Sequence, residues 1–116
     1  MSYRKRELVR FAYVDAAGIV FYPRYFEMLN GAVEDWFAQM GAGFASLHLE
    51  RRIGVPTVSL STRFLAPSRL GDILDIDLGV SRWGNTSLDV GFTGTVEGRP
   101  VFTATITYVG VAFGTK

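Results

Sequence analysis

Residues 23–40, PRYFEMLNGAVEDWFAQM, decide the fold of this chain. Apolar side chains recur in this stretch at spacings of three and four, which is the period of an α-helix with one buried face. Pro23 suits the first helical turn, where its missing N–H is no loss, and Gly41 suits the position that ends a helix. We therefore predict a long helix over residues 23–40 whose broad apolar stripe is formed by Phe26, Leu29, Val33, Trp36 or Phe37, and Met40, flanked by Tyr25 and Ala32.

On both sides of this helix the pattern is that of β-strands. A first strand is predicted over residues 4–13, and after Gly54 apolar and polar residues alternate with a period of two. The alternating runs cover residues 57–64, 74–81, 88–93 and 101–108, with a turn at Glu97-Gly98-Arg99-Pro100. Residues 42–52 are ambiguous, and a short second helix there is left open. One long helix against a five-stranded antiparallel sheet is an α+β fold.

Composition limits the class of protein. The chain has 116 residues, 48% of them hydrophobic, which is enough for the core of a single domain over residues 1–116. Twelve basic and eleven acidic residues give a net charge of +1, so neither nucleic acid nor a membrane is expected as the main partner. The absence of cysteine excludes disulfides, thiolate catalysis and zinc–thiolate sites. No signal peptide or membrane-spanning run is evident, which predicts a cytoplasmic protein. No metal or other cofactor is expected.

Aromatic residues are abundant, at 14% of the chain. Such a content indicates either a dense core or an apolar surface that is reserved for a partner. Nothing in the sequence covers the outer face of the predicted sheet or its edge. Because an uncovered edge presents unpaired backbone groups, pairing with a second copy is favoured.

The segment before the helix, Asp15-Ala16-Ala17-Gly18-Ile19-Val20-Phe21-Tyr22-Pro23, contains the candidate chemistry. Asp15 stands among small and apolar residues, and Gly18 permits an unusual backbone angle or the close approach of a ligand. The helix start supplies free N–H groups and the positive end of the helix dipole. A carboxylate facing such donors is the minimum equipment for acyl transfer. Taken alone, an aspartate before a helix is more often a cap or turn residue, so both interpretations stay open.

This segment resembles the signature of the 4-hydroxybenzoyl-CoA thioesterase family of hotdog-fold proteins. The family pattern, approximately Asp-x-Ala-Gly-Ile-Val-aromatic-Tyr-Pro-x-Tyr, is matched by Asp15, Ala17, Gly18, Ile19, Val20, Phe21, Tyr22, Pro23 and Tyr25. A weaker similarity continues through residues 54–59, the strand that begins at Asp72, and residues 82–83. The resemblance implies a hotdog fold, in which a long central helix is wrapped by a curved five-stranded antiparallel sheet. It also implies a homodimer or homotetramer with the active site at the subunit interface.

The resemblance further implies a reaction, the hydrolysis of an acyl-CoA thioester to free acid and CoA. The acyl group would be aromatic or short-to-medium aliphatic. Asp15 would be the nucleophile or the general base, and the backbone N–H of Tyr22 would stabilise the oxyanion. The residues expected to contact the substrate are Gly18, Phe21, Pro23, Val58 and Ser59.

Other polar residues have plainer interpretations. His48, the only histidine, is interpreted as a surface or interface residue, as are Glu34 and Asp35. Alternation turns Asp75 and Asp77 outward, which is typical of a solvated strand face. Arginines that could meet the CoA phosphates, each of them more often plain surface charge, are Arg51, Arg52, Arg63, Arg69 and Arg82.

Two positions depart from the family pattern, and two other function classes stay open. Asn30 stands where some relatives have an acidic residue, and residues 84–86 stand where some have a basic cluster, so the acyl group is left open. A non-catalytic acyl-CoA-binding or regulatory module would share the fold. A hotdog hydratase or dehydratase would need an Asp/His or Glu/His pair, and the single histidine, His48, argues against it.

Overall fold

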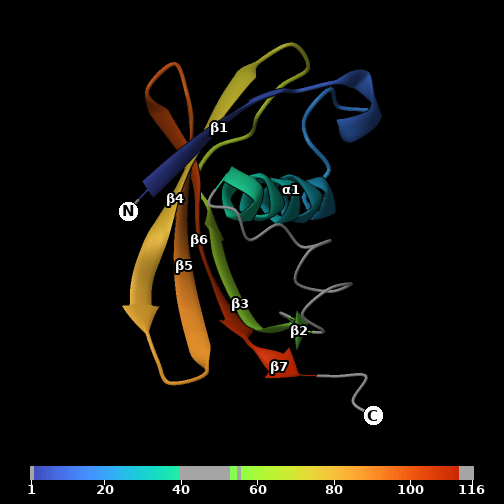
Figure 1. Cartoon of the computed structure of the whole chain (residues 1–116). Coiled ribbons are helices and arrows are strands. Elements are labelled where there is room, and N and C mark those ends of the chain that lie inside the picture. Colours follow the sequence, from blue (N-terminus) through green and yellow to red (C-terminus); the bar gives the residue numbers. More distant parts are fainter. Residues whose placement is uncertain (1, 40–52, 55, 113–116) are drawn as a thin grey trace.

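The computed structural model describes residues 2–39, 53–54 and 56–112. Its main feature is an α-helix, α1 (Pro23–Gln39), that lies across one face of an antiparallel sheet (Figure 1). Five strands form this sheet in the order β1-β4-β5-β6-β3. Their bounds are β1 (Ser2–Leu8), β3 (Thr57–Phe64), β4 (Ile73–Trp83), β5 (Ser87–Val96) and β6 (Arg99–Val109). The predicted α+β arrangement is therefore confirmed. A small second sheet pairs β2 (Ile53–Gly54) with β7 (Val111–Ala112).

The helix begins at Pro23, as predicted, and is described as far as Gln39. Its buried face differs slightly from the predicted stripe, because Phe26 and Phe37 lie at the border and are only partly buried. Met28 takes a place in the core instead. The buried positions of α1 are Tyr25, Met28, Leu29, Ala32, Val33 and Trp36.

The strand bounds agree with the period-two pattern except in β1. β3 has the predicted bounds, and β4, β5 and β6 extend the predicted runs by a few residues. β1 ends at Leu8 rather than near residue 13, because Leu8 pairs with Ile73, the first residue of the partner strand β4. Val9 still exchanges backbone hydrogen bonds with Asp72 and Gly71, and the chain then forms a short 3-10 helix, η1 (Phe11–Tyr13).

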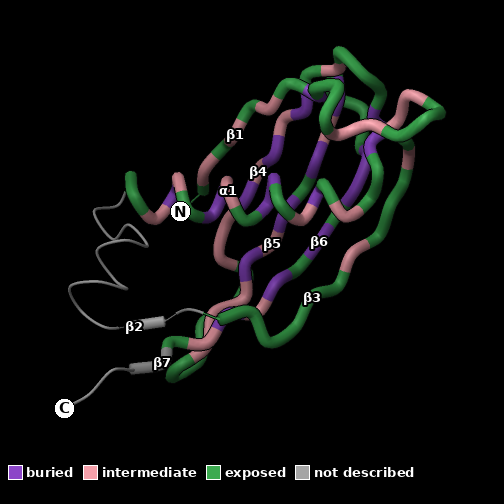
Figure 2. Tube along the Cα trace, turned by 90° about the vertical axis from the view of Figure 1, so that its right-hand side faces the viewer, coloured by how far each residue is buried: buried purple, intermediate pink, exposed green. Residues whose placement is uncertain are grey.

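Side chains alternate across the sheet. The positions of β6 that face α1 are buried, whereas Thr103 and Thr105 face solvent on the other side. Gly94 of β5 leaves room for the ring of Phe102, since a Cβ at Gly94 would lie only 2.1 Å from that ring. Figure 2 shows buried residues along β4, β5 and β6, whereas β3 is exposed along most of its length. The core thus lies between α1 and the central strands.

The turn between β5 and β6 is tighter than predicted. Val96 pairs with Arg99, which leaves only Glu97 and Gly98 in the turn. Both have positive φ, 51° and 79°, the conformation of a two-residue type I′ hairpin turn. Pro100, expected in the turn, is the second residue of β6.

The two edges of the main sheet differ in charge. On β1, Arg4 and Arg6 each form a two-point ion pair with β4, to Asp77 at 2.7 Å and to Asp75 at 2.9 Å. The hydrogen bond from Arg6 lowers the pKa of the Asp75 carboxyl below its usual value. Asp75 and Asp77 face outward as predicted, but arginines cover them in part, so that 14% and 42% of their side chains are exposed. Along the other edge, β3, the described residues form no such charge ladder.

Six predictions fall on residues outside the described ranges. They concern Met40 as part of the apolar stripe, Gly41 as the end of the helix, the ambiguous segment 42–52, His48 as a surface or interface residue, and Arg51 and Arg52 as phosphate contacts.

Candidate functional site

The segment between β1 and α1 folds into a hairpin that includes Asp15. The Asp15 N–H donates to the carbonyl of Ile19 at 3.0 Å, the Phe21 N–H donates to the carbonyl of Tyr13 at 2.9 Å, and Val14 pairs with Val20 between them. In such a ladder successive side chains point to opposite faces. Val20 is buried, with 7% of its surface exposed, so Asp15 and Phe21 lie together on the outer face.

The tip of this hairpin is closed by Asp15 itself. The Gly18 N–H donates to the Asp15 carbonyl at 2.9 Å, and the Ala17 N–H donates to Asp15 Oδ1 at 2.8 Å. Gly18 has a φ of 77°, a left-handed conformation that suits glycine. Asp15 is exposed, and no ion pair of the described residues includes it. The aspartate is thus a turn residue and also an accessible carboxylate.

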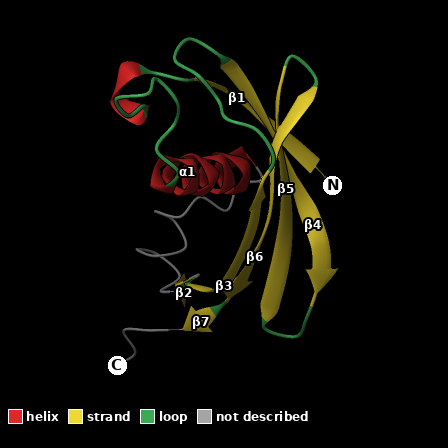
Figure 3. Cartoon of the chain, turned by 180° about the vertical axis from the view of Figure 1, so that it is seen from behind, coloured by secondary structure: helices red, strands yellow, loops and turns green. Residues whose placement is uncertain are grey.

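A third stretch of chain, in the β3–β4 connection, runs beside the hairpin (Figure 3). The Val20 N–H donates to the carbonyl of Ser68 at 2.8 Å, and the Leu70 N–H donates to the carbonyl of Gly18 at 3.0 Å. Ile19 and Arg69 are the paired residues between these two hydrogen bonds.

This pairing decides which side chains of the β3–β4 connection face the candidate site. Directly paired residues present their side chains on the same face of a ladder. Arg69, opposite Ile19, therefore shares the outer face with Asp15, whereas Ser68 turns inward beside Val20. Arg69 is exposed and Ser68 is 0% exposed, in agreement with this alternation.

The start of α1 offers fewer free donors than the sequence suggests. Pro23 has no N–H, the Arg24 N–H donates to the carbonyl of Phe21 at 2.8 Å, and the Tyr25 N–H donates to the carbonyl of Tyr22 at 3.1 Å. No hydrogen bond within the described part of the chain uses the Tyr22 N–H. Of the four amides around the helix start, the one free donor is therefore the one that the family resemblance singles out.

Exposed aromatic rings surround the helix start. The rings of Phe21 and Tyr22 meet edge to face at 5.7 Å, and Tyr22 meets Phe64 of β3 at 6.1 Å. About half of each of these side chains is exposed. The sequence pattern marked Phe64 only as one position of an alternating strand. Its place beside Tyr22 depends on where β3 crosses the helix, which no local signal reveals.

Two of the expected substrate contacts lie away from this hairpin. Val58 and Ser59 are exposed near the start of β3, whereas Phe64 ends it. At about 3.3 Å per residue, Val58 is roughly 20 Å along the strand from Phe64. Gly18, Phe21 and Pro23, by contrast, belong to the hairpin and the helix start. One subunit thus brings together five of the seven predicted site residues.

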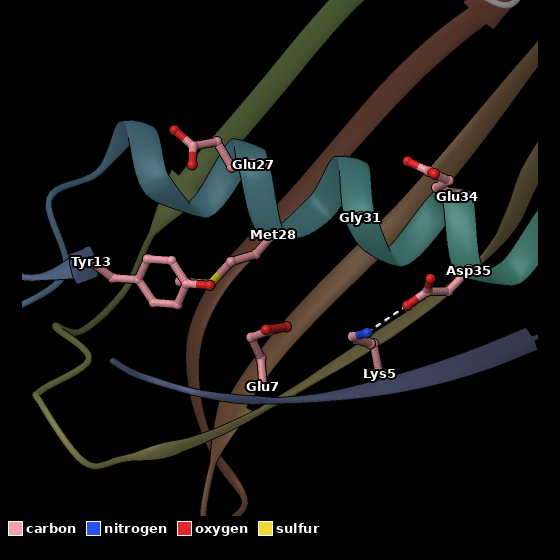
Figure 4. A pocket seen from close by; sticks show the side chains of 8 residues that line it. All are labelled: Lys5, Glu7, Tyr13, Glu27, Met28, Gly31, Glu34 and Asp35. Atoms are coloured by element: carbon pink, nitrogen blue, oxygen red, sulfur yellow. Dashed lines mark hydrogen bonds and ion pairs between the residues drawn. The ribbon is translucent and has the colours of Figure 1, made fainter. Parts of the chain in front are cut away.

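A groove of about 310 Å³ lies between α1 and β1 (Figure 4). Glu7, Glu27, Glu34 and Asp35 line it, and Lys5 ion-pairs with Asp35 across it. The excess of carboxylates is unfavourable for the phosphates of CoA. Because it forms an ion pair with Lys5, Asp35 links α1 to β1. Glu34 is an exposed helix residue.

The remaining arginines of residues 2–39, 53–54 and 56–112 differ in their surroundings. Arg82 approaches Asp89 at 4.0 Å, whereas Arg63 and Arg69 form no ion pair within these ranges. No cluster of three acidic or histidine side chains in these ranges could hold a metal ion. Within the same ranges, no helix is long and apolar enough to cross a membrane.

Comparison with known proteins identifies the family. The model of the thioesterase-like superfamily matches residues 9–116. The 4-hydroxybenzoyl-CoA thioesterase of Pseudomonas sp. strain CBS-3 is 30% identical over 88 residues, which cover 74% of this chain and 62% of that protein. The 1,4-dihydroxy-2-naphthoyl-CoA hydrolase of Thermosynechococcus vestitus is 30% identical over 85 residues, covering 73% and 58%. The chain spans about three fifths of the length of these two relatives.

Solved structures agree with this result. The 4-hydroxybenzoyl CoA thioesterase of Pseudomonas sp. strain CBS-3 superimposes with a TM-score of 0.88 at 25% identity, covering 99% of this chain and 88% of that one. A 4-hydroxybenzoyl CoA thioesterase with an aspartate replaced by asparagine has been solved in complex with 4-hydroxybenzoyl CoA, and it superimposes with a TM-score of 0.89 at 25% identity. The predicted hotdog fold is confirmed. By its fold and by the match over residues 9–116, the chain belongs to the thioesterase-like superfamily.

Proposed function

We propose that this chain hydrolyses the thioester of an acyl-CoA to the free acid and CoA. One observation carries the proposal: a single hairpin that leads into α1 presents an exposed carboxylate at Asp15 and, at Tyr22, an N–H that bonds to no described residue. The names of the relatives support the same reaction class, and the acyl groups in those names are aromatic. An aromatic or short-to-medium aliphatic acyl group is therefore proposed for this chain.

The proposed chemistry divides two roles between Asp15 and the backbone of Tyr22. The Tyr22 N–H donates a hydrogen bond to the thioester oxygen and stabilises the negative charge that develops there, an effect typically worth about 10²–10³ in rate. As nucleophile, Asp15 attacks the carbonyl carbon and expels CoA thiolate, and water then cleaves the mixed anhydride. As general base, Asp15 instead takes a proton from the attacking water. Both routes yield the acid and CoA.

The other residues of the hairpin have supporting roles in this proposal. Phe21, half exposed and on the same face as Asp15, provides an apolar contact for the acyl group or the pantetheine arm. Gly18 closes the tip without a side chain, and Pro23 fixes the start of the helix without adding a competing N–H. The substrate thus meets backbone and apolar surface around one carboxylate.

Arg69 is the arginine that best suits the CoA phosphates. Its pairing with Ile19 puts it on the face of Asp15, and it is exposed and free of ion pairs within the described ranges. A guanidinium binds phosphate oxygens in a two-point geometry. Arg82, in contrast, is near Asp89, and Arg63, next to Phe64 on β3, has its side chain on the opposite face of the strand from Phe64.

A homodimer or homotetramer with the site at the subunit interface also belongs to the proposal. β3 is an exposed edge whose apolar side chains Val58 and Leu60 are 59% and 44% exposed, and such an edge is a template for pairing with another chain. Edge-to-edge pairing of two β3 strands in antiparallel fashion would bring the start of one strand toward the end of the other. Val58 and Ser59 would then serve the site of the partner subunit.

The proposal is tested by measuring thiol release from a panel of aromatic and aliphatic acyl-CoAs, together with equilibrium binding of the same compounds. We expect saturable release with at least one aromatic acyl-CoA. Saturable binding without release would instead indicate a non-catalytic binding module. In this proposal residues 1–116 act as a single domain, in the cytoplasm and without a cofactor.

A further inference from the structure

Ser68 is an unusual core residue. Apart from tyrosines, it is the one polar residue in the buried class within the described ranges, with 0% of its surface exposed. Burying a hydroxyl is unfavourable unless it is hydrogen-bonded. The hydroxyl of Tyr25, itself only 4% exposed, donates to Ser68 Oγ at 2.8 Å. The two side chains therefore satisfy each other inside the protein.

This hydrogen bond joins the two parts of the candidate site. Tyr25 belongs to the first turn of α1, and its N–H is bonded to the carbonyl of Tyr22. Ser68 belongs to the β3–β4 connection, and its carbonyl holds the hairpin through the Val20 N–H at 2.8 Å. The Tyr25–Ser68 bond thus connects the helix start, which presents the Tyr22 N–H, to the hairpin that presents Asp15.

Packing alone would keep the ring of Tyr25 in place. It lies 5.6 Å from the ring of Phe64 and 5.1 Å from the ring of Phe102, centroid to centroid. A phenylalanine at this position would keep both contacts. The hydroxyl of Tyr25 therefore adds orientation to a ring that is already held in the core.

We propose that Tyr25 and Ser68 are positioning residues for thioester hydrolysis, an inference that rests on the proposed function. Both are too deeply buried to touch the substrate. Their hydrogen bond fixes the Asp15 carboxylate relative to the Tyr22 N–H. Because a displacement of about 1 Å can lower a catalytic rate about 100-fold, a single buried bond can control turnover without contacting the substrate.

The test compares Tyr25→Phe with Tyr108→Phe. Tyr108 is a matched control, since it is 3% exposed and its hydroxyl has no hydrogen-bond partner among the described residues. With the best acyl-CoA of the panel, Tyr25→Phe should lower kcat about tenfold or more and leave KM within about threefold of wild type. Tyr108→Phe should leave both constants at the wild-type value. All kinetics are measured at a temperature at which circular dichroism shows every variant folded.

A second variant keeps the test independent of the folding of Tyr25→Phe. Ser68→Ala removes the acceptor and should lower kcat to a similar extent. If the two residues act as one unit, the double variant loses no more activity than the more impaired single variant. If the fold loss of kcat in the double variant equals the product of the two single-variant losses, the two residues do not share a role.

The outcomes separate this inference from the proposed function. If the wild-type protein releases thiol and both Tyr25→Phe and Ser68→Ala keep the wild-type kcat, the positioning role alone is overturned. Equal losses in Tyr25→Phe and Tyr108→Phe also overturn it, because they would reflect general core damage. Absence of thiol release by the wild-type protein overturns the proposed function and this inference with it.

Discussion

The side chain of Asp15 accepts a backbone hydrogen bond and is also exposed to solvent. Its Oδ1 accepts the Ala17 N–H at 2.8 Å, which fixes the orientation of the carboxylate with respect to the hairpin. Its exposed surface remains available to a ligand, because no cation of the described residues pairs with it. A turn aspartate and a catalytic aspartate are therefore compatible interpretations. The turn supplies the rigid geometry that acyl transfer needs.

Recognition of the CoA phosphates by Arg69 can be tested with a single substitution. We expect Arg69→Ala to raise KM for an acyl-CoA severalfold with little change in kcat, since a contact to the distant phosphates contributes equally to ground state and transition state. The rise should shrink at high ionic strength. Arg99→Ala is the control, because Arg99 is exposed and without an ion pair within the described ranges but lies at the β5–β6 turn. A KM equally raised in both variants would contradict a specific role of Arg69.

Strand β6 contains a buried phenol, that of Tyr108, whose ionisation destabilises the folded state. Burial raises the pKa of Tyr108 from 10.0 to about 12. The stability that depends on the neutral phenol is therefore complete below pH 10 and is lost as the pH rises through about 12. At pH 11 this loss amounts to about 1.4 kcal/mol.

Urea unfolding of wild type and Tyr108→Phe at pH 9 and pH 11 measures this effect. The variant should gain about 1.4 kcal/mol relative to wild type between the two pH values, because phenylalanine cannot ionise. A difference between the two proteins that stays constant across this range would show that Tyr108 ionises as easily in the folded state as in the unfolded one.

At the scale of elements, the sequence predicts what depends on periodicity. The period of 3.6 located α1, and the period of two gave the bounds of β3 and the centres of β4, β5 and β6. The predicted end of β1 was wrong, because β1 ends where its partner strand β4 begins. The residues of β1 themselves do not set this end. Local propensity contains no information about a partner strand.

In the candidate site, too, the sequence predicts only part of the arrangement. Asp15, Gly18 and the start of α1 form a continuous stretch, so a contiguous motif could reveal them. Ser68 and Phe64 come from a separate segment and reach the site through tertiary pairing. A serine between Pro67 and Arg69 looks like an ordinary loop residue, and nothing in the sequence indicates that it is buried against Tyr25.

For the whole molecule, the unlike edges of the sheet predict which strand forms the subunit contact. β1 is protected by its ion pairs to β4, whereas β3 is exposed and lacks them. Leu8 and Leu60 are comparable probes, one on each edge, with 41% and 44% of their surfaces exposed. If the proposed oligomer forms through β3, Leu60→Lys should convert it to monomer and abolish the proposed turnover, whereas Leu8→Lys should preserve both the assembly and the turnover.

Sedimentation equilibrium and thiol release measured on the same samples check this prediction. Dissociation by Leu8→Lys but not by Leu60→Lys would assign the contact to the wrong edge. A fully active monomer would contradict a site that is shared between subunits.

Asp15 and the backbone amide of Tyr22 are proposed to act together in the hydrolysis of an acyl-CoA. The most direct measurement is kcat for thiol release by wild type, Asp15→Asn and Tyr22→Phe, with acyl-CoA binding measured in parallel. Asp15→Asn should retain binding and lose most of its turnover, because the amide can neither attack the carbonyl nor accept a proton. Tyr22→Phe should have a mild effect, because it keeps the backbone N–H. Comparable turnover in wild type and Asp15→Asn over the whole panel would contradict the account.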